Sequence, residues 1–114
     1  MEPVVEAERV TWIDVGQDFA RILTRRSRND GEFSGEAFRE DILEPALLIN
    51  DKVVLNIDAI EHYSMAWMDE AISGVSRKYG VDFARGKIFF STSKKFYLLP
   101  VLEQLLQVAG GHVI

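Results

Sequence analysis

The chain has 114 residues, of which 47% are hydrophobic and 27% charged, and its net charge is −5. This length and composition indicate one globular domain that can bury its own core. The sequence contains no cysteine, so disulfides, thiolate metal sites and a cysteine nucleophile are excluded.

The acidic balance argues against nucleic acid as the main ligand, because a surface that neutralises many phosphates is usually basic. No apolar run approaches the ~20 residues that a membrane-spanning helix needs. The first ten residues, MEPVVEAERV, carry three glutamates and do not resemble a secretory signal. We therefore expect a cytoplasmic protein that binds neither nucleic acid nor membranes.

The first strand is predicted at residues 10–15, VTWIDV, which are mainly β-branched and aromatic. Residues 17–24 are ambiguous: a short helix capped by Asp18 is favoured, and an edge strand is the alternative. Residues 25–33 contain the turn-forming letters NDG and are predicted as a loop.

Positive charge is concentrated in and before this loop. Charged runs are usually solvated surface, and this is the favoured interpretation. The alternative is contact with an anion or a phosphate group, which guanidinium groups bind well. The arginines concerned are Arg21, Arg25, Arg26 and Arg28.

A helix is predicted within residues 35–48. Ser34 is placed to cap it, and Glu36 adds negative charge near its positive end. An apolar stripe of helical period starts at Phe38. Pro45 lacks the N–H of a continuous helix, which predicts a kink or a restart there.

Residues 52–57, KVVLNI, are apolar almost without alternation, which is typical of a central strand covered on both faces. A connection over residues 58–63 leads to a helix that Ser64 caps and Gly80 ends. The predicted inward stripe of this helix is Met65, Met68, Ile72, Val75 and Tyr79.

Residues 81–86 are predicted as a loop, 87–91 as a short buried strand and 97–109 as a last helix with Pro100 in its first turn. The glycine pair that follows would stop this helix, and the last three residues form a tail able to add an edge strand.

Strands that alternate with helices indicate an α/β fold. We expect a single domain over residues 1–114, with its core at 10–110. Its sheet would be small, largely parallel or mixed, with about four strands and three to four helices.

The candidate site lies at residues 58–70, with the turn at 91–95 beside it, because function in parallel sheets usually lies at the carboxyl ends of strands. Its polar members are Asp58, Glu61, His62, Tyr63, Ser64, Asp69 and Glu70.

A metal or acid–base site built from Asp58, Glu61 and His62 is one interpretation, because these side chains offer oxygen and imidazole ligands. It is disfavoured, since the only other histidine is His112. Ser64 lacks the base and the oxyanion hole that a nucleophilic serine requires. We expect no metal, no cofactor and no enzymatic activity.

Trp67 is rotated by about 100° from Met68 around the helix axis. It either packs beside the inward stripe, which is the favoured interpretation, or stays partly exposed as an anchor for a partner.

Three stretches resemble the STAS-like domain family of unknown function, which is related to the STAS domains of bacterial anti-sigma-factor antagonists. They are SGEAFREDILEPAL at 34–47, VVLNIDAIE at 53–61 and SMAWMDEAISGV at 64–75. With the order of elements, the resemblance extends over residues 10–110.

The resemblance implies a non-catalytic regulatory module that binds a protein partner. STAS antagonists bind a histidine-kinase-like ATPase and are switched by phosphorylation of a serine or threonine at the start of the helix after this strand. Here the position of that serine is Met65 if the family motif is aligned on LNI at 55–57, and Ala66 if it is aligned on DEA at 69–71. Ser64 is then either the phosphoacceptor or, in the favoured interpretation, a plain helix cap.

The motif residues also have predicted structural roles. Arg39 is expected to pair with Asp69 or Glu70 and to join the two helices by a structural ion pair. The residues that match the family motif are Ser34, Gly35, Glu36, Phe38, Arg39, Asp69 and Glu70. The residues predicted to bind the partner are Asp58, His62, Ser64, Trp67, Asp69 and Glu70.

Two alternatives stay open. One is a small ligand- or metal-binding domain or an enzyme that uses residues 58–70. The other is a homo-oligomer that forms through the C-terminal segment or an open sheet edge.

Overall fold

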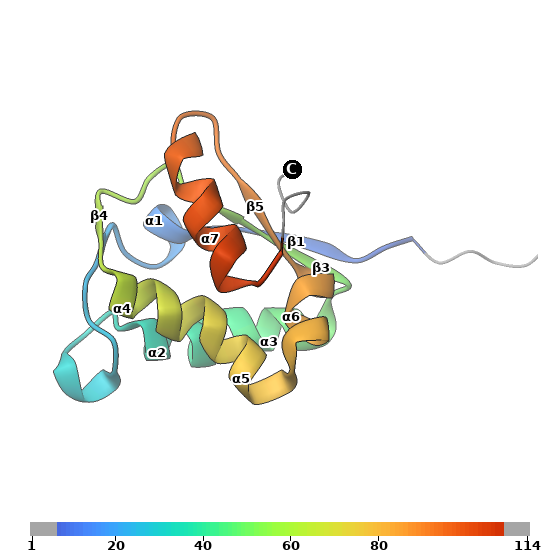
Figure 1. Cartoon of the computed structure of the whole chain (residues 1–114), viewed down its shortest axis with the longest axis horizontal. Coiled ribbons are helices and arrows are strands. Elements are labelled where there is room, and N and C mark those ends of the chain that lie inside the picture. Colours follow the sequence, from blue (N-terminus) through green and yellow to red (C-terminus); the bar gives the residue numbers. More distant parts are fainter. Residues whose placement is uncertain (1–6, 109–114) are drawn as a thin grey trace, which may run out of the picture.

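A computed structural model describes residues 7–108 of the chain and shows a three-stranded parallel sheet at its centre (Figure 1). The strands are β1 (Val10–Asp14), β3 (Lys52–Asn56) and β5 (Ile88–Ser91), in the order β1-β3-β5. Connections that contain helices join them, as the alternation of strands and helices predicted. The α/β fold with a mostly parallel sheet is therefore confirmed.

The central strand β3 is covered on both faces, as predicted, since Val53, Val54 and Leu55 are all buried. The edge strand β1 is covered on one face only. Its Ile13 belongs to the core, whereas Trp12 is 56% exposed. The main core thus lies between the face that carries Ile13 and the helices.

A separate parallel pair of two short strands, β2 (Ile22–Leu23) and β4 (His62–Tyr63), lies beyond the carboxyl ends of the main strands (Figure 1). The favoured prediction of a helix over residues 17–24 is wrong. Helix α1 is earlier and shorter, at Val15–Asp18, and the edge-strand alternative is confirmed for β2.

The cap of α1 is Asp14 rather than Asp18. The Asp14 carboxylate accepts the Gln17 N–H at 3.0 Å, and the Asp18 carboxylate accepts the Asp14 N–H at 2.8 Å. These two bonds close a single helical turn directly after β1. The residues that follow are then extended and pair with β4.

The first long helix continues through Pro45, where the sequence predicts a kink or a restart. Just before the proline, the Glu44 N–H bonds to the carbonyl oxygen of Arg39, five residues back. This wide turn accommodates the proline ring without ending the helix. The helix comprises α2 (Gly35–Phe38), the π-helical turn η2 (Arg39–Leu43) and α3 (Glu44–Ile49).

The second long helix is divided in the same way and lies beside the first (Figure 1). Ser34 caps the first helix by accepting the Ala37 N–H, and Ser64 caps the second by accepting the Trp67 N–H, as predicted. Gly80 ends the second helix, also as predicted. The helix comprises α4 (Met65–Met68), the π-helical turn η3 (Asp69–Ser73) and α5 (Gly74–Tyr79).

The buried side of the second helix is wider than the predicted stripe. Met68, Ile72 and Val75 are buried as predicted, but Met65 is 51% exposed and Trp67 only 2%. The helix packs against α2 as well as against the core face of the sheet. Trp67, which lies on the side of the second helix that faces the first helix, is therefore also buried.

The segment after Gly80 differs from the prediction. Residues 81–86, predicted as a loop, belong to helix α6 (Val81–Lys87), whose Ala84 is fully buried. Contact with α5 stabilises this helix although Gly86 lowers its intrinsic propensity.

The last described helix is α7 (Leu99–Leu105), which follows the 3₁₀ turn η4 (Phe96–Leu98). Pro100 lies in its first turn, as predicted. The helix ends before the predicted boundary at residue 109. The predicted glycine stop and the tail at residues 109–114 lie outside the described residues.

Gly35 allows the close approach of the two long helices, because an added Cβ would lie 2.6 Å from the Trp67 carbonyl oxygen. We expect Gly35→Ala to lower the free energy of unfolding by about 1–3 kcal/mol, since the helices must separate. Gly86→Ala is the matched control. Its added Cβ has no neighbour within 4 Å, so it should raise the same quantity by about 0.5–1 kcal/mol. Urea denaturation measures both changes, and equal effects would contradict the close contact.

Candidate functional site

The carboxyl ends of the strands bring the two predicted loops together. Asp58, after β3, accepts hydrogen bonds from the Thr92 hydroxyl, from the Ser93 N–H at 3.0 Å and from the Ser93 hydroxyl at 2.9 Å. The hydrogen bond from Thr92, with those from Ser93, lowers the pKa of Asp58 to about 2. Asp58 is thus an ionised carboxylate that fixes the turn after β5.

The interpretation of a metal or acid–base site at Asp58, Glu61 and His62 gains no support from this geometry. Glu61 and His62 are exposed, and His62 lies opposite Ile22 in the short β2–β4 pair. Within residues 7–108, no group of three or more histidine, aspartate or glutamate side chains is arranged to hold a metal ion.

The Ser64 hydroxyl group makes two hydrogen bonds. The oxygen accepts the Trp67 N–H at 3.1 Å, and the hydroxyl donates to the Thr24 carbonyl oxygen at 3.1 Å. Ser64 also donates its backbone N–H to the Leu23 carbonyl oxygen at 2.8 Å. The predicted cap therefore also ties the start of the second helix to the strand β2.

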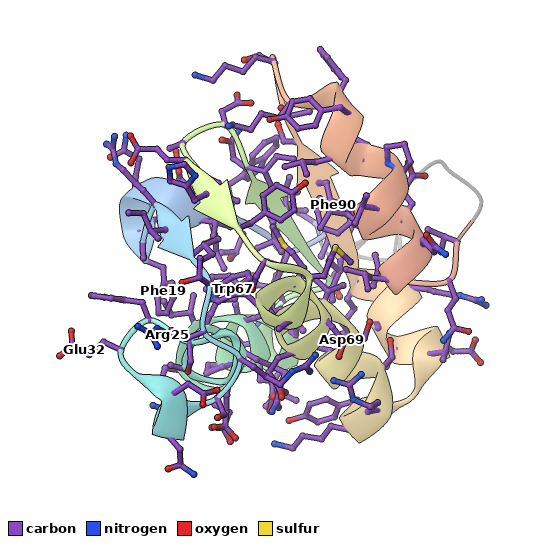
Figure 2. The ribbon with its side chains drawn as sticks, turned by 60° about the vertical axis from the view of Figure 1, so that its left-hand side comes forward. Phe19, Arg25, Glu32, Trp67, Asp69 and Phe90 are labelled. Carbon is purple, nitrogen blue, oxygen red and sulfur yellow. The ribbon has the colours of Figure 1, made fainter. Side chains whose placement is uncertain are left out.

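The alternative in which Trp67 is exposed to a partner is wrong, and the packing interpretation is confirmed. Its indole N–H donates to the Phe33 carbonyl oxygen at 2.9 Å. Its ring centroid lies 5.2 Å from that of Phe38 and 6.3 Å from that of Phe19. Figure 2 shows Trp67 and Phe19 among the side chains of the core. Trp67 positions the loop before the first helix and is not available at the surface.

Asp69 and Glu70 have different partners. Asp69 pairs with Arg26 at 2.8 Å and with Arg77 at 3.2 Å, and the hydrogen bond from Arg26 lowers its pKa. Glu70 accepts from Arg39 at 3.2 Å. The prediction that Arg39 pairs with Asp69 or Glu70 is therefore confirmed, and Glu70 is the partner.

Glu44, which no sequence pattern singled out, completes the network around Arg39. Arg39 donates to Glu44, which also accepts from Lys78 at 2.7 Å and from the Tyr79 hydroxyl at 3.0 Å. Burial acts to raise the pKa of Glu44, but the hydrogen bonds from Lys78, Arg39 and Tyr79 outweigh it and hold the pKa below its ordinary value. The network joins the two long helices, with Arg39 and Glu44 buried and Lys78 at its exposed edge.

The remaining motif residues of the first helix also stabilise the fold. Phe38 is fully buried, and Glu36 accepts the Arg28 N–H at 2.9 Å. With the cap at Ser34 and the close contact at Gly35, the motif describes how the first helix starts and packs.

Two arginines of the arginine-rich segment are paired with carboxylates. Arg26 pairs with Asp69, and Arg28 pairs with Glu40 at 3.1 Å and with Asp41 at 2.6 Å. These pairs favour the interpretation of a solvated surface over that of an anion site, because two of the four guanidinium groups already have anionic partners.

A family model described as a STAS-like domain of unknown function matches residues 34–95. The match spans more than half of the chain, and the chain belongs to this family. The comparisons of the chain with curated proteins and with solved structures found no match. In the part of the chain that the structure describes, no helix is long and apolar enough to cross a membrane.

The hydrogen bonds to Asp58 make stability depend on pH. Because the pKa of Asp58 falls from 3.8 to about 2 on folding, its contribution is present above pH 3.8 and is lost as the pH falls towards 2. Asp58→Asn should lower the free energy of unfolding at pH 7 by roughly 1–2 kcal/mol and flatten its decrease in acid.

Urea denaturation at a series of pH values measures this effect. Asp82→Asn, an exposed change on α6, is the control and should alter stability by less than about 0.5 kcal/mol. The same acid dependence in Asp58→Asn and in the parent chain would show that Asp58 has no such role.

Arg39 is the buried cation of its network, with a side chain 11% exposed. We expect Arg39→Met to lower the free energy of unfolding by about 3 kcal/mol or more, since Glu44 and Glu70 lose their shared partner. Arg77→Met removes a guanidinium whose side chain is 52% exposed, and should cost less than about 1 kcal/mol. Thermal and urea unfolding compare the two variants, and similar losses would refute the special role of Arg39.

Proposed function

We propose that the chain is a non-catalytic protein-interaction module whose docking surface surrounds the capped start of the second helix. The observation that carries this proposal is a group of exposed apolar side chains beside Ser64. Ile22 is 56% exposed, Met65 51% and Tyr63 37%. Exposed apolar residues that gather beside polar ones are typical of protein contact sites.

The fold explains why these residues meet. Ile22 lies in β2, directly opposite His62 in β4, and Tyr63 leads into the cap at Ser64. Met65 is the first residue of the second helix. His62 and Ser64 from the predicted partner-binding set thus lie among the exposed apolar residues.

The resemblance to anti-sigma-factor antagonists suggests the partner, a histidine-kinase-like ATPase. Phosphorylation of Ser64 would add a charge of about −2 in the middle of this surface. It would also remove the hydroxyl proton that bonds to Thr24. Both effects would oppose docking of a partner against the apolar side chains.

Ile22→Asp is expected to weaken binding of a histidine-kinase-like ATPase partner at least tenfold, because the change places a charge in the contact. Leu48→Asp is the control: Leu48 is 59% exposed but lies near the end of α3, next to the amino ends of the strands. A pull-down followed by titration calorimetry gives both affinities. Equal binding by the two variants would refute the proposed surface.

The same assay separates the two roles of Ser64. Ser64→Asp keeps a good cap and adds charge, whereas Ser64→Ala loses the cap without adding charge. A phosphorylation switch predicts that Ser64→Asp weakens binding tenfold and that Ser64→Ala does not. A plain cap predicts a loss of about 1 kcal/mol of stability in Ser64→Ala and unchanged binding in both. Light scattering of the free chain tests the alternative of self-association.

A further inference from the structure

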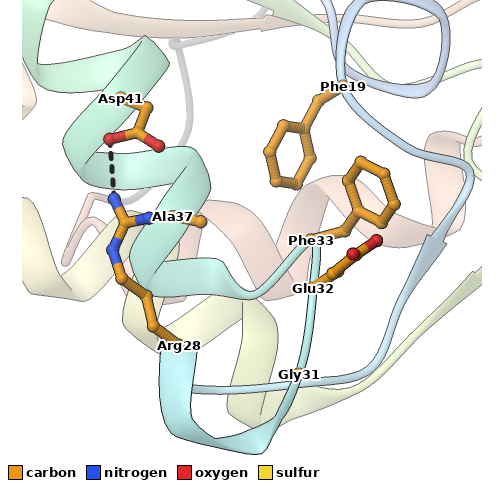
Figure 3. A pocket seen from close by; sticks show the side chains of 7 residues that line it. All are labelled: Phe19, Arg28, Gly31, Glu32, Phe33, Ala37 and Asp41. Atoms are coloured by element: carbon orange, nitrogen blue, oxygen red, sulfur yellow. Dashed lines mark hydrogen bonds and ion pairs between the residues drawn. The ribbon is translucent and has the colours of Figure 1, made fainter.

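A groove lies between the end of α1 and the loop that precedes the first long helix (Figure 3). Its volume is about 540 Å³. None of the residues that line the groove belongs to the surface around Ser64. The groove is therefore a separate feature. The lining residues are Phe19, Arg28, Gly31, Glu32, Phe33, Ala37 and Asp41.

One wall of the groove is aromatic. The rings of Phe19 and Phe33 meet edge to face, with centroids 5.5 Å apart, and Phe33 remains 50% exposed. Phe33 has a φ of +55°, which is rare for a bulky residue and costs free energy. The Trp67 indole holds this conformation by its bond to the Phe33 carbonyl oxygen. The strained backbone directs the Phe33 ring to the groove.

The groove is acidic despite the arginine that lines it. The Arg28 guanidinium is already bound by Glu40 and Asp41, at 3.1 and 2.6 Å. Glu32 lines the groove next to Phe33 (Figure 3). Its carboxylate has no hydrogen-bond or ion-pair partner among the described residues. The carboxylates around the groove are Glu32, Glu36, Glu40 and Asp41.

Two guanidinium groups oppose these four carboxylates. They are Arg28 and Arg25, whose side chain lies against Gly31. The local charge is therefore negative, which attracts a cation and repels a phosphate. An apolar side chain alone would match the rings but would leave the carboxylate of Glu32 without a partner.

We propose that this groove binds an arginine side chain of a protein partner. A guanidinium group is planar, stacks on aromatic rings and pairs with carboxylates through its N–H groups. Phe33 would provide the ring, and Glu32 would provide the free carboxylate. The inference extends the proposed interaction role, but it does not depend on the partner being an ATPase.

A peptide titration followed by NMR tests the groove directly. The full chain is titrated with acetyl-Gly-Arg-Gly-amide and, in parallel, with the same peptide containing citrulline, which has the shape of arginine without its charge. Ionic strength is kept constant. We expect the signals of Phe19, Glu32 and Phe33 to shift at least threefold more with the arginine peptide. Equal shifts with both peptides, or shifts centred elsewhere on the chain, would overturn the proposal.

Variants identify the groups that bind. Glu32→Gln should reduce the shifts caused by the arginine peptide at least twofold, and Phe33→Leu should do the same without breaking the backbone bond to Trp67. Asp82→Asn, an exposed carboxylate change on α6, should leave them unchanged. If Glu32→Gln and Asp82→Asn have equal effects, the attraction is only general charge and the groove is not the site.

The outcomes also separate the groove from the surface around Ser64. If the peptide does not bind but Ile22→Asp still weakens partner binding, the proposed arginine site in the groove is refuted and the proposed function stands. If the peptide binds in the groove while Ile22→Asp has no effect on partner binding, the arginine site is supported and the proposed docking surface is refuted.

Discussion

The two long helices meet at Gly35 so closely that a Cβ there would collide with the carbonyl oxygen of Trp67. This contact brings the cap at Ser64 next to the chain segment that contains Thr24, whose carbonyl oxygen the cap binds. It also brings the Trp67 indole to the carbonyl oxygen of Phe33. The positions of the surface around Ser64 and of the aromatic groove thus both depend on one helix contact.

The buried ion pairs depend on the irregular geometry of the same helices. In a regular α-helix, residues five apart point about 140° away from each other, so Arg39 and Glu44 would not meet. The π-helical turn between them has more residues per turn and brings both to one side. In the second helix, Gly74 leaves room for the arginine, because an added Cβ would lie 2.7 Å from its Nε.

Features set by local chemistry could be predicted from the sequence, whereas features set by distant partners could not. Ser34 and Ser64 are caps because a serine before a helix satisfies the amides of the first turn. The strand His62–Tyr63 is too short to show an alternating pattern, and it exists because β2 pairs with it. Trp67 is buried because the first helix covers it. Ala84 is buried because residues 81–86, predicted as a loop, form a helix that packs against α5.

The same distinction holds for the candidate site. Asp58 could be placed at the carboxyl edge because parallel strands end together, but its partners Thr92 and Ser93 come from a turn 34 and 35 residues away. The groove could not be predicted. Phe19 and Phe33 meet across a loop, and no pattern in the sequence marks a phenylalanine with positive φ.

The polar residues of the candidate site are mostly engaged in holding the fold together. Asp58 fixes a turn, Ser64 caps a helix and Glu70 binds a buried arginine, so their hydrogen-bonding capacity is directed inward. Among the described residues, the groups without such partners at the same end of the molecule include the exposed apolar side chain of Met65 and the carboxylate of Glu32. Covering apolar area is favourable in itself, and a carboxylate is stabilised where the covering surface supplies a cation, so this distribution is consistent with the proposed binding role.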